Sequence, residues 1–123
     1  MNAKPAKRTA WKFGLFAETL AAWHLRFRGY RILARRFRGP VGEIDIVARR
    51  GRLLVFVEVK ARRDALTAAE SITPRQRNRI IRAAQAFVQA RPALAALDQR
   101  FDAILIGSGW WPVHLVDAWR PEL

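Results

Sequence analysis

The first stretch of the chain has apolar residues at helical spacing. Over residues 10–28 they fall mostly three or four positions apart, as Trp11, Leu15 and Leu20 illustrate. Gly29 follows the last of them, and glycine commonly ends a helix. The pattern therefore predicts one long amphipathic helix over residues 10–28.

Three strands are predicted next. Residues 30–37 favour a short basic strand, while residues 43–49 and 53–61 alternate between apolar and polar positions. Arg50-Gly51 separates the two alternating segments and is typical of a tight turn. We therefore expect these two strands to form an antiparallel hairpin.

A second helix has a well-marked start. Thr73-Pro74-Arg75-Gln76 fits a capping box with proline at the first helical position. Apolar residues at helical spacing continue towards Pro92, which predicts the end of this helix. Residues 62–72, before it, lack periodicity and are predicted as a loop.

The last part of the chain predicts another strand pair. Residues 93–99 read as a short connection with a helical turn, and residues 101–106 and 110–116 as strands. Pro112 favours an edge position, because proline cannot donate a ladder hydrogen bond. The order α-β-β-β-α-β-β predicts an α/β fold whose mixed sheet of about five strands is flanked by helices.

The composition indicates the number of domains and the class of partner that the protein binds. The 123 residues suit one domain, expected over residues 10–123 after a flexible basic arm at residues 1–9. Twenty-three Lys and Arg against ten Asp and Glu give a net charge of +13, which favours binding to nucleic acid. An anionic membrane ranks well below it. With no cysteine, no signal-peptide pattern and no apolar run long enough to span a bilayer, we expect a cytoplasmic protein.

The candidate catalytic and metal-binding residues lie on the predicted hairpin. Alternation places Glu43 and Asp45 on one face of their strand, opposite Ile44 and Ile46, and Glu58 and Lys60 on one face of the next strand. A turn centred on Arg50-Gly51 puts Glu43 opposite Glu58, whereas a loop two residues longer puts Asp45 there. In either register, carboxylates and one ammonium group lie together.

Clustered carboxylates need a cation between them. The cation is either a guanidinium or a divalent metal, and oxygen ligands favour Mg²⁺ or Mn²⁺. Such an ion activates water for phosphodiester cleavage, and Lys60 is placed to stabilise the developing charge. Glu18, the one acid before Glu43, has no helical salt-bridge partner, so it points either into the interior or to solvent at the edge of the apolar stripe.

These residues resemble a known signature. Gly42-Glu43-Ile44-Asp45, followed by Glu58-Val59-Lys60, is similar to the PD-(D/E)XK nuclease motif, although Ile44 stands where the motif has proline. With the helix that carries Glu18 and with Arg100-Phe101-Asp102, the chain resembles the YraN-like family, which is similar to archaeal Holliday junction resolvases. The resemblance implies a restriction-endonuclease-like three-layer αβα fold.

The resemblance also implies roles for individual residues. Asp45 and Glu58 would bind the metal, with the carbonyl of Val59 as a further ligand, and Lys60 would be the catalytic lysine. Glu43 remains an alternative to Asp45. Glu18 would match the acid of the first helix, and Gln76 a polar residue of the second, although its capping role explains Gln76 equally well. A homodimer is implied as well, because a two-fold junction suits a two-fold enzyme.

Several residues have competing interpretations. Candidate phosphate contacts, whose alternative is a solvated basic surface, are Arg35, Arg36, Arg38, Arg62 and Arg63. His24 and His114 are interpreted as surface or packing residues, and the five tryptophans mostly as core, with one or two exposed rings able to stack on bases.

Two functions follow from these patterns. The first is a metal-dependent endonuclease acting on DNA, with branched or junction DNA as its substrate. The alternative is a nucleic-acid-binding module that keeps the nuclease architecture without catalysis. Charge supports both, whereas the clustered acids and Lys60 favour the enzyme.

Overall fold

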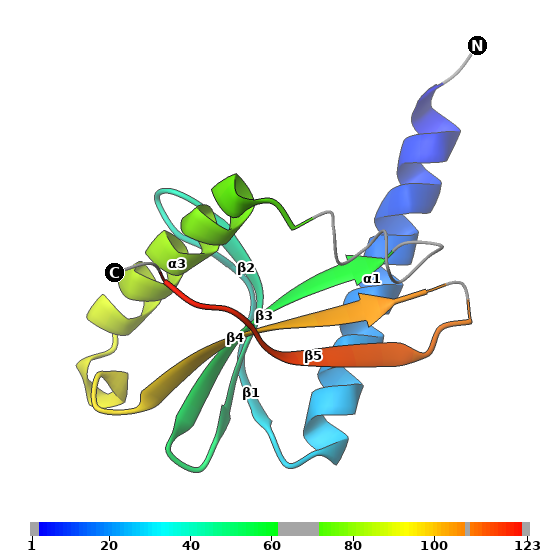
Figure 1. The fold of residues 1–123 in the computed structure, drawn as a ribbon. Helices are drawn as coiled ribbons and strands as arrows, with labels where there is room; N and C mark the ends of the chain where they lie inside the picture. Colours follow the sequence, from blue (N-terminus) through cyan, green and yellow to red (C-terminus); the bar gives the residue numbers. More distant parts are fainter. Residues whose placement is uncertain (1–2, 62–71, 108, 122–123) are drawn as a thin grey trace.

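The computed structural model describes residues 3–61, 72–107 and 109–121, with side chains from residue 14 onwards. Its elements (Figure 1) are helix α1 (Ala3–Phe27), strands β1 (Arg31–Arg38), β2 (Glu43–Arg50) and β3 (Leu53–Ala61), helix α3 (Pro74–Gln89), the 3₁₀ turn η1 (Pro92–Leu94), and strands β4 (Asp98–Ile106) and β5 (Pro112–Trp119). The predicted order of helices and strands is confirmed. The loop predicted over residues 62–72 lies outside the described residues except for Ile72, which is buried.

Helix α1 begins earlier than the sequence predicts. It starts at Ala3, so residues 3–9, predicted as a flexible arm, are helical. Alanine, lysine and arginine are strong helix formers, and Pro5 lies in the first turn, where no backbone donor is needed. The predicted end is confirmed: Gly29 has a φ of +88°, and its N–H donates to the carbonyl of Arg26.

One five-stranded sheet, in the order β1-β2-β3-β4-β5, forms the middle layer. Strands β3 and β4 run parallel, and the other neighbours are antiparallel. Figure 1 shows α1 on one side of the sheet and α3 on the other. The predicted α/β class, with a central mixed sheet in a three-layer αβα arrangement, is confirmed.

Each helix packs on its own hydrophobic core. Helix α1 buries Ala17, Ala21 and Leu25 against a face that includes Ile46 and Val57. Because alanine side chains are short, they let the helix backbone lie close to the strands. Burying each large aliphatic side chain contributes about 1.5–3 kcal/mol.

The second core is mainly aromatic. On the α3 side of the sheet, Phe56 stacks on Phe101 with ring centroids 5.4 Å apart and meets Phe87 of α3 at 6.2 Å. Ile80 and Ala83 extend the contact along α3. These two cores fix both helices on the strands that carry the candidate site residues.

The hairpin register decides between the two predicted arrangements. Arg50 pairs with Leu53 and Ile46 with Val57, so the turn is Gly51-Arg52, with a φ of +61° at Gly51. Continued by one pair, this register sets Asp45 opposite Glu58. The ladder itself stops at Ile46 and Val57, so β2 and β3 separate where the two acids lie.

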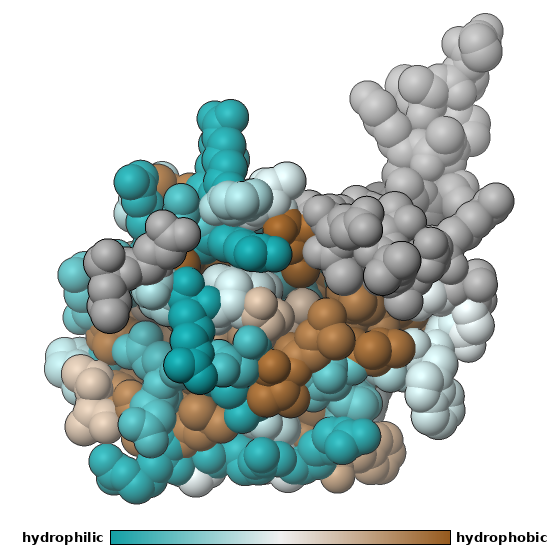
Figure 2. Space-filling model, viewed as in Figure 1, coloured by the Kyte–Doolittle hydropathy of each residue, from teal (hydrophilic) through white to brown (hydrophobic). Residues whose placement is uncertain are grey.

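Strand β5 is an edge strand, as Pro112 predicts. It exposes Val113, Leu115 and Val116, and Figure 2 shows apolar side chains gathered over β5 among hydrophilic ones. In the described part of the chain, no helix is long and apolar enough to cross a membrane.

Candidate metal and nucleic-acid site

Asp45 occupies the point where β2 leaves β3. Its Oδ2 accepts a hydrogen bond of 2.8 Å from the backbone N–H of Val59. In an extended strand, the N–H and C=O of one residue point to the same side, so the Val59 carbonyl is also turned towards Asp45. The separation of the strands thus places a carboxylate and a main-chain oxygen together.

The path of β2 changes at Asp45. Ile44 packs in the core under α3, whereas Ile46 packs in the core under α1. The prediction that both isoleucines share one face is therefore wrong, because regular alternation breaks between them. The side chain of Glu43 is 44% exposed and pairs with Arg38 at 3.5 Å, and it makes no ion pair or hydrogen bond with Glu58 in the described part of the chain.

Glu58 and Asp45 form a carboxyl pair whose protonation is governed mainly by burial. Burial, and then the charge of Asp45, raise the pKa of Glu58 to about 8. Burial also raises the pKa of Asp45, and the charge of Glu18 adds to that rise. Glu58 therefore keeps its proton at neutral pH and donates it to Asp45.

Two side chains contact Glu58 Oε1. Lys60 Nζ lies 3.7 Å away, and Gln76 Nε2 donates a hydrogen bond of 3.1 Å. The capping box predicted for α3 is half confirmed: Thr73 Oγ1 accepts from the Gln76 N–H, while the Gln76 side chain reaches across to Glu58 instead of back to Thr73. The start of α3 is thereby tied to β3.

Glu18 points into the interior, and the solvated alternative is wrong. It is 6% exposed and accepts hydrogen bonds from Arg35 Nε at 3.2 Å and Arg36 Nε at 3.1 Å. Consecutive strand residues ordinarily point to opposite faces, but Arg36 has a φ of +54°, which accompanies the turn of both arginines to one acid. Arg35 and Arg36 are thus engaged within the protein.

The donor set fits Mg²⁺ or Mn²⁺ better than softer metals. Asp45 and Glu58 offer carboxylate oxygens and Val59 offers a carbonyl, and Mg²⁺ completes its shell with water and phosphate. Within the described ranges, no three His, Cys, Asp or Glu side chains are grouped to hold a metal by themselves. Arg62 and Arg63, candidate phosphate contacts, lie outside the described residues.

A further buried acid was not singled out as a site residue. Asp102 is fully buried, accepts two hydrogen bonds of 2.8 Å from Arg100 and lies 2.8 Å from His114 Nε2. Burial alone would raise the pKa of Asp102, but His114, Arg100 and the Asp117 N–H together hold it below its ordinary value. The Arg-x-Asp spacing was the available signal, since both side chains share one face of β4.

The two histidines, interpreted as surface or packing residues, pack against each other. The rings of His24 and His114 meet edge to face at 5.4 Å, although they are distant in sequence. The interpretation of the tryptophans as mostly core is wrong for those whose side chains are described: Trp119 is buried, while Trp23, Trp110 and Trp111 are exposed.

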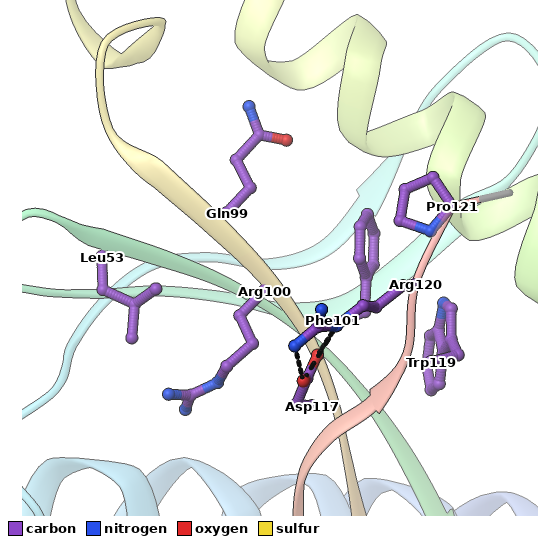
Figure 3. A pocket seen from close by; sticks show the side chains of 8 residues that line it. All are labelled: Leu53, Gln99, Arg100, Phe101, Asp117, Trp119, Arg120 and Pro121. Carbon is purple, nitrogen blue, oxygen red and sulfur yellow. Dashed lines mark hydrogen bonds and ion pairs between the residues drawn. The ribbon is translucent and has the colours of Figure 1, made fainter. Parts of the chain in front are cut away.

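A hollow of about 490 Å³ lies where β4 begins and β5 ends. Figure 3 shows Arg100 and Arg120 among its lining side chains, with Arg120 held by Asp117. None of the acids on β2, β3 or α1 lines it. Because Asp102 and Asp117 engage both arginines, this hollow offers little free positive charge.

The comparisons with known proteins agree with one another. The model of the family described as "Uncharacterised protein family UPF0102" matches residues 17–106. A UPF0102 protein of Nitrobacter winogradskyi is 56% identical over 109 residues, which cover 89% of this chain and 92% of the relative. A UPF0102 protein of Parvibaculum lavamentivorans is 54% identical over 112 residues, covering 91% of this chain and 84% of the relative. The chain therefore belongs to the UPF0102 family.

Proposed function

We propose that this protein is an endonuclease that uses Mg²⁺ or Mn²⁺ to hydrolyse DNA phosphodiester bonds, with branched or junction DNA as its substrate class. The observation that carries the proposal is the carboxyl pair of Asp45 and Glu58 at the separation of β2 and β3. Burial and then the charge of Asp45 raise the pKa of Glu58, while burial and then the charge of Glu18 raise that of Asp45, and a divalent cation between the carboxyls would offset both effects.

The metal ligands in this proposal are the oxygens of Asp45 and Glu58 and the Val59 carbonyl. A bound divalent ion supplies charge that acidifies water and neutralises the phosphodiester. Gln76 holds Glu58 Oε1 at 3.1 Å and orients this ligand. A small protein donor set suits Mg²⁺, because the substrate phosphate and water provide the remaining oxygens.

Lys60 is the proposed catalytic lysine. Its side chain is 16% exposed, and its Nζ stays within 3.7 Å of Glu58, so the ammonium is held beside the proposed metal position. There it stabilises negative charge that develops on the phosphate. Glu18 is a positioning residue: with Arg35 and Arg36 it fastens α1 to β1 next to Asp45.

Affinity for DNA comes from the charge of the chain. The net charge of +13 favours a polyanion, because binding releases counterions from the phosphates. The pattern of Asp45 with Glu58-Val59-Lys60 resembles the PD-(D/E)XK signature, which supports DNA cleavage as the reaction. The same resemblance supports a junction substrate.

The test is cleavage of labelled duplex, flap, four-way-junction and single-stranded DNA in EDTA, Mg²⁺ or Mn²⁺. We expect metal-dependent cutting that falls at least 100-fold, a loss of roughly 3 kcal/mol in transition-state stabilisation, in Asp45→Asn and in Lys60→Ala. Glu43→Gln is the matched control, because it neutralises an exposed acid of the same strand and should leave cutting intact.

If no DNA structure is cut in either metal by the folded wild-type protein, the endonuclease proposal fails. Salt-sensitive binding that survives Asp45→Asn and Lys60→Ala, without cutting, would instead favour the nucleic-acid-binding module. If Glu43→Gln abolishes cutting and Asp45→Asn does not, the ligand assignment is wrong even though the reaction stands.

A further inference from the structure

A second hollow, of about 490 Å³, lies between the end of α1 and the start of β5. It is lined by His24, Phe27, Arg28, Trp111 and Pro112. Phe27 is 85% exposed and Trp111 79%, the two highest values among the large apolar side chains of the described residues. Exposed rings that border a hollow are typical of a binding surface, because their hydration is unfavourable.

Two polar groups of this hollow lack partners among the described residues. Arg28 makes no ion pair with a described residue, and the buried Nε2 of His24 has no hydrogen-bond partner in the described part. Burial, then the charge of Arg28, then His114 lower the pKa of His24, so its ring is neutral near pH 7. A neutral imidazole nitrogen donates or accepts according to its tautomer. The hollow thus offers stacking surfaces and one positive charge.

We propose that this hollow binds an unstacked base and the adjacent phosphate of a single-stranded nucleic-acid segment. The base stacks on Trp111 and Phe27, and Arg28 pairs with the phosphate. Bases stacked within a duplex present no free face to an aromatic side chain, so the hollow selects single-stranded regions.

This inference rests on the proposed function, because it assigns a single-stranded segment to the same substrate. His24 follows Glu18 by six residues on α1, which is about 9 Å along the helix axis. That distance corresponds to roughly three nucleotides of a stacked strand, which rise about 3.4 Å each. This distance is therefore short enough for a strand seated in the hollow to continue towards the carboxyl pair.

The experiment measures fluorescence anisotropy of labelled single-stranded and hairpin-duplex oligonucleotides in EDTA, which prevents cutting. Trp111→Ala and Phe27→Ala should each bind single strands roughly 5- to 150-fold more weakly, with little change for the duplex. Val41→Ala is the control, because it removes an exposed apolar side chain between β1 and β2, outside the hollow, and should bind as wild type does. An abasic strand should lose affinity for wild type but not for Trp111→Ala.

The outcomes separate this inference from the proposed function. If wild type binds single strands and both ring variants bind them equally well, the hollow is not a base site, while the nuclease proposal stands. Equal weakening for single strand and duplex also overturns it, since that reports a general effect. If wild type binds no nucleic acid at low salt, both proposals fail. Circular dichroism melting shows that each variant is folded.

Discussion

At the scale of single residues, the candidate site owes its properties to burial. Glu58 is 6% exposed beside a second carboxyl, a combination that raises its pKa to about 8. The sequence could predict that Asp45, Glu58 and Lys60 meet, because alternation puts them on facing strands. It could not predict that Gln76 would turn to Glu58, since its capping partner Thr73 offers an equally good local contact.

Stability should depend on pH through Glu58. Its pKa rises from 4.5 to about 8 on folding, so between these values the unfolded chain releases a proton that the folded protein retains. Folding stability therefore falls as the pH rises through this window. Glu58→Gln mimics the protonated acid and keeps the acceptor for Gln76, so it should escape this loss.

Urea unfolding in EDTA tests that prediction. The difference in free energy of unfolding between Glu58→Gln and wild type should shift in favour of the variant as the pH rises from about 5 to about 8.5. The expected shift is on the order of 1 kcal/mol or more. The same stability difference at both pH values would show that the Glu58 carboxyl titrates normally.

At the scale of elements, close backbone approach positions the hairpin against α3. A Cβ added at Gly42 would lie 2.9 Å from the backbone oxygen of Arg79, so the turn before β2 touches the helix directly. The limits of β2 and β3 could be predicted because their periodicity is strong, whereas β4 begins at Asp98, three residues before the predicted start, and β5 spans Pro112–Trp119 instead of residues 110–116. The change of path at Asp45 could not, because it depends on the opposing cores that take up Ile44 and Ile46.

Two glycine substitutions should have opposite effects. Gly42→Ala should destabilise the protein by about 1–3 kcal/mol, because the helix backbone cannot yield easily. Gly14→Ala should stabilise it by about 0.5–1 kcal/mol, since nothing lies within 4 Å of the added Cβ and alanine favours the helix. Thermal unfolding of the two variants checks this. A stable Gly42→Ala protein would show that the turn and α3 are loosely packed.

At the scale of the whole molecule, the exposed edge of the sheet is a candidate surface for dimerisation. Strand β5 exposes Val113, Leu115 and Val116 at an edge with no further strand in the described residues. Apolar edge strands pair readily with other chains. The sequence resemblance implied a homodimer, and it stays a prediction because one chain alone does not test it.

Light scattering over a range of concentrations measures the oligomeric state. We expect a dimer that Val116→Lys converts to monomer, because a charged edge residue opposes strand pairing. A wild-type protein that remains monomeric at every concentration would remove this prediction without affecting the carboxyl site.

Calorimetric titration of Mn²⁺ into the protein measures whether Asp45 and Glu58 form a divalent-metal site. We predict one site in wild type and in Glu43→Gln, with proton release on binding because Glu58 must ionise. Asp45→Asn and Glu58→Gln should lose that site. If Mn²⁺ binds all four folded proteins alike, or binds none of them, the carboxyl pair is not a metal site.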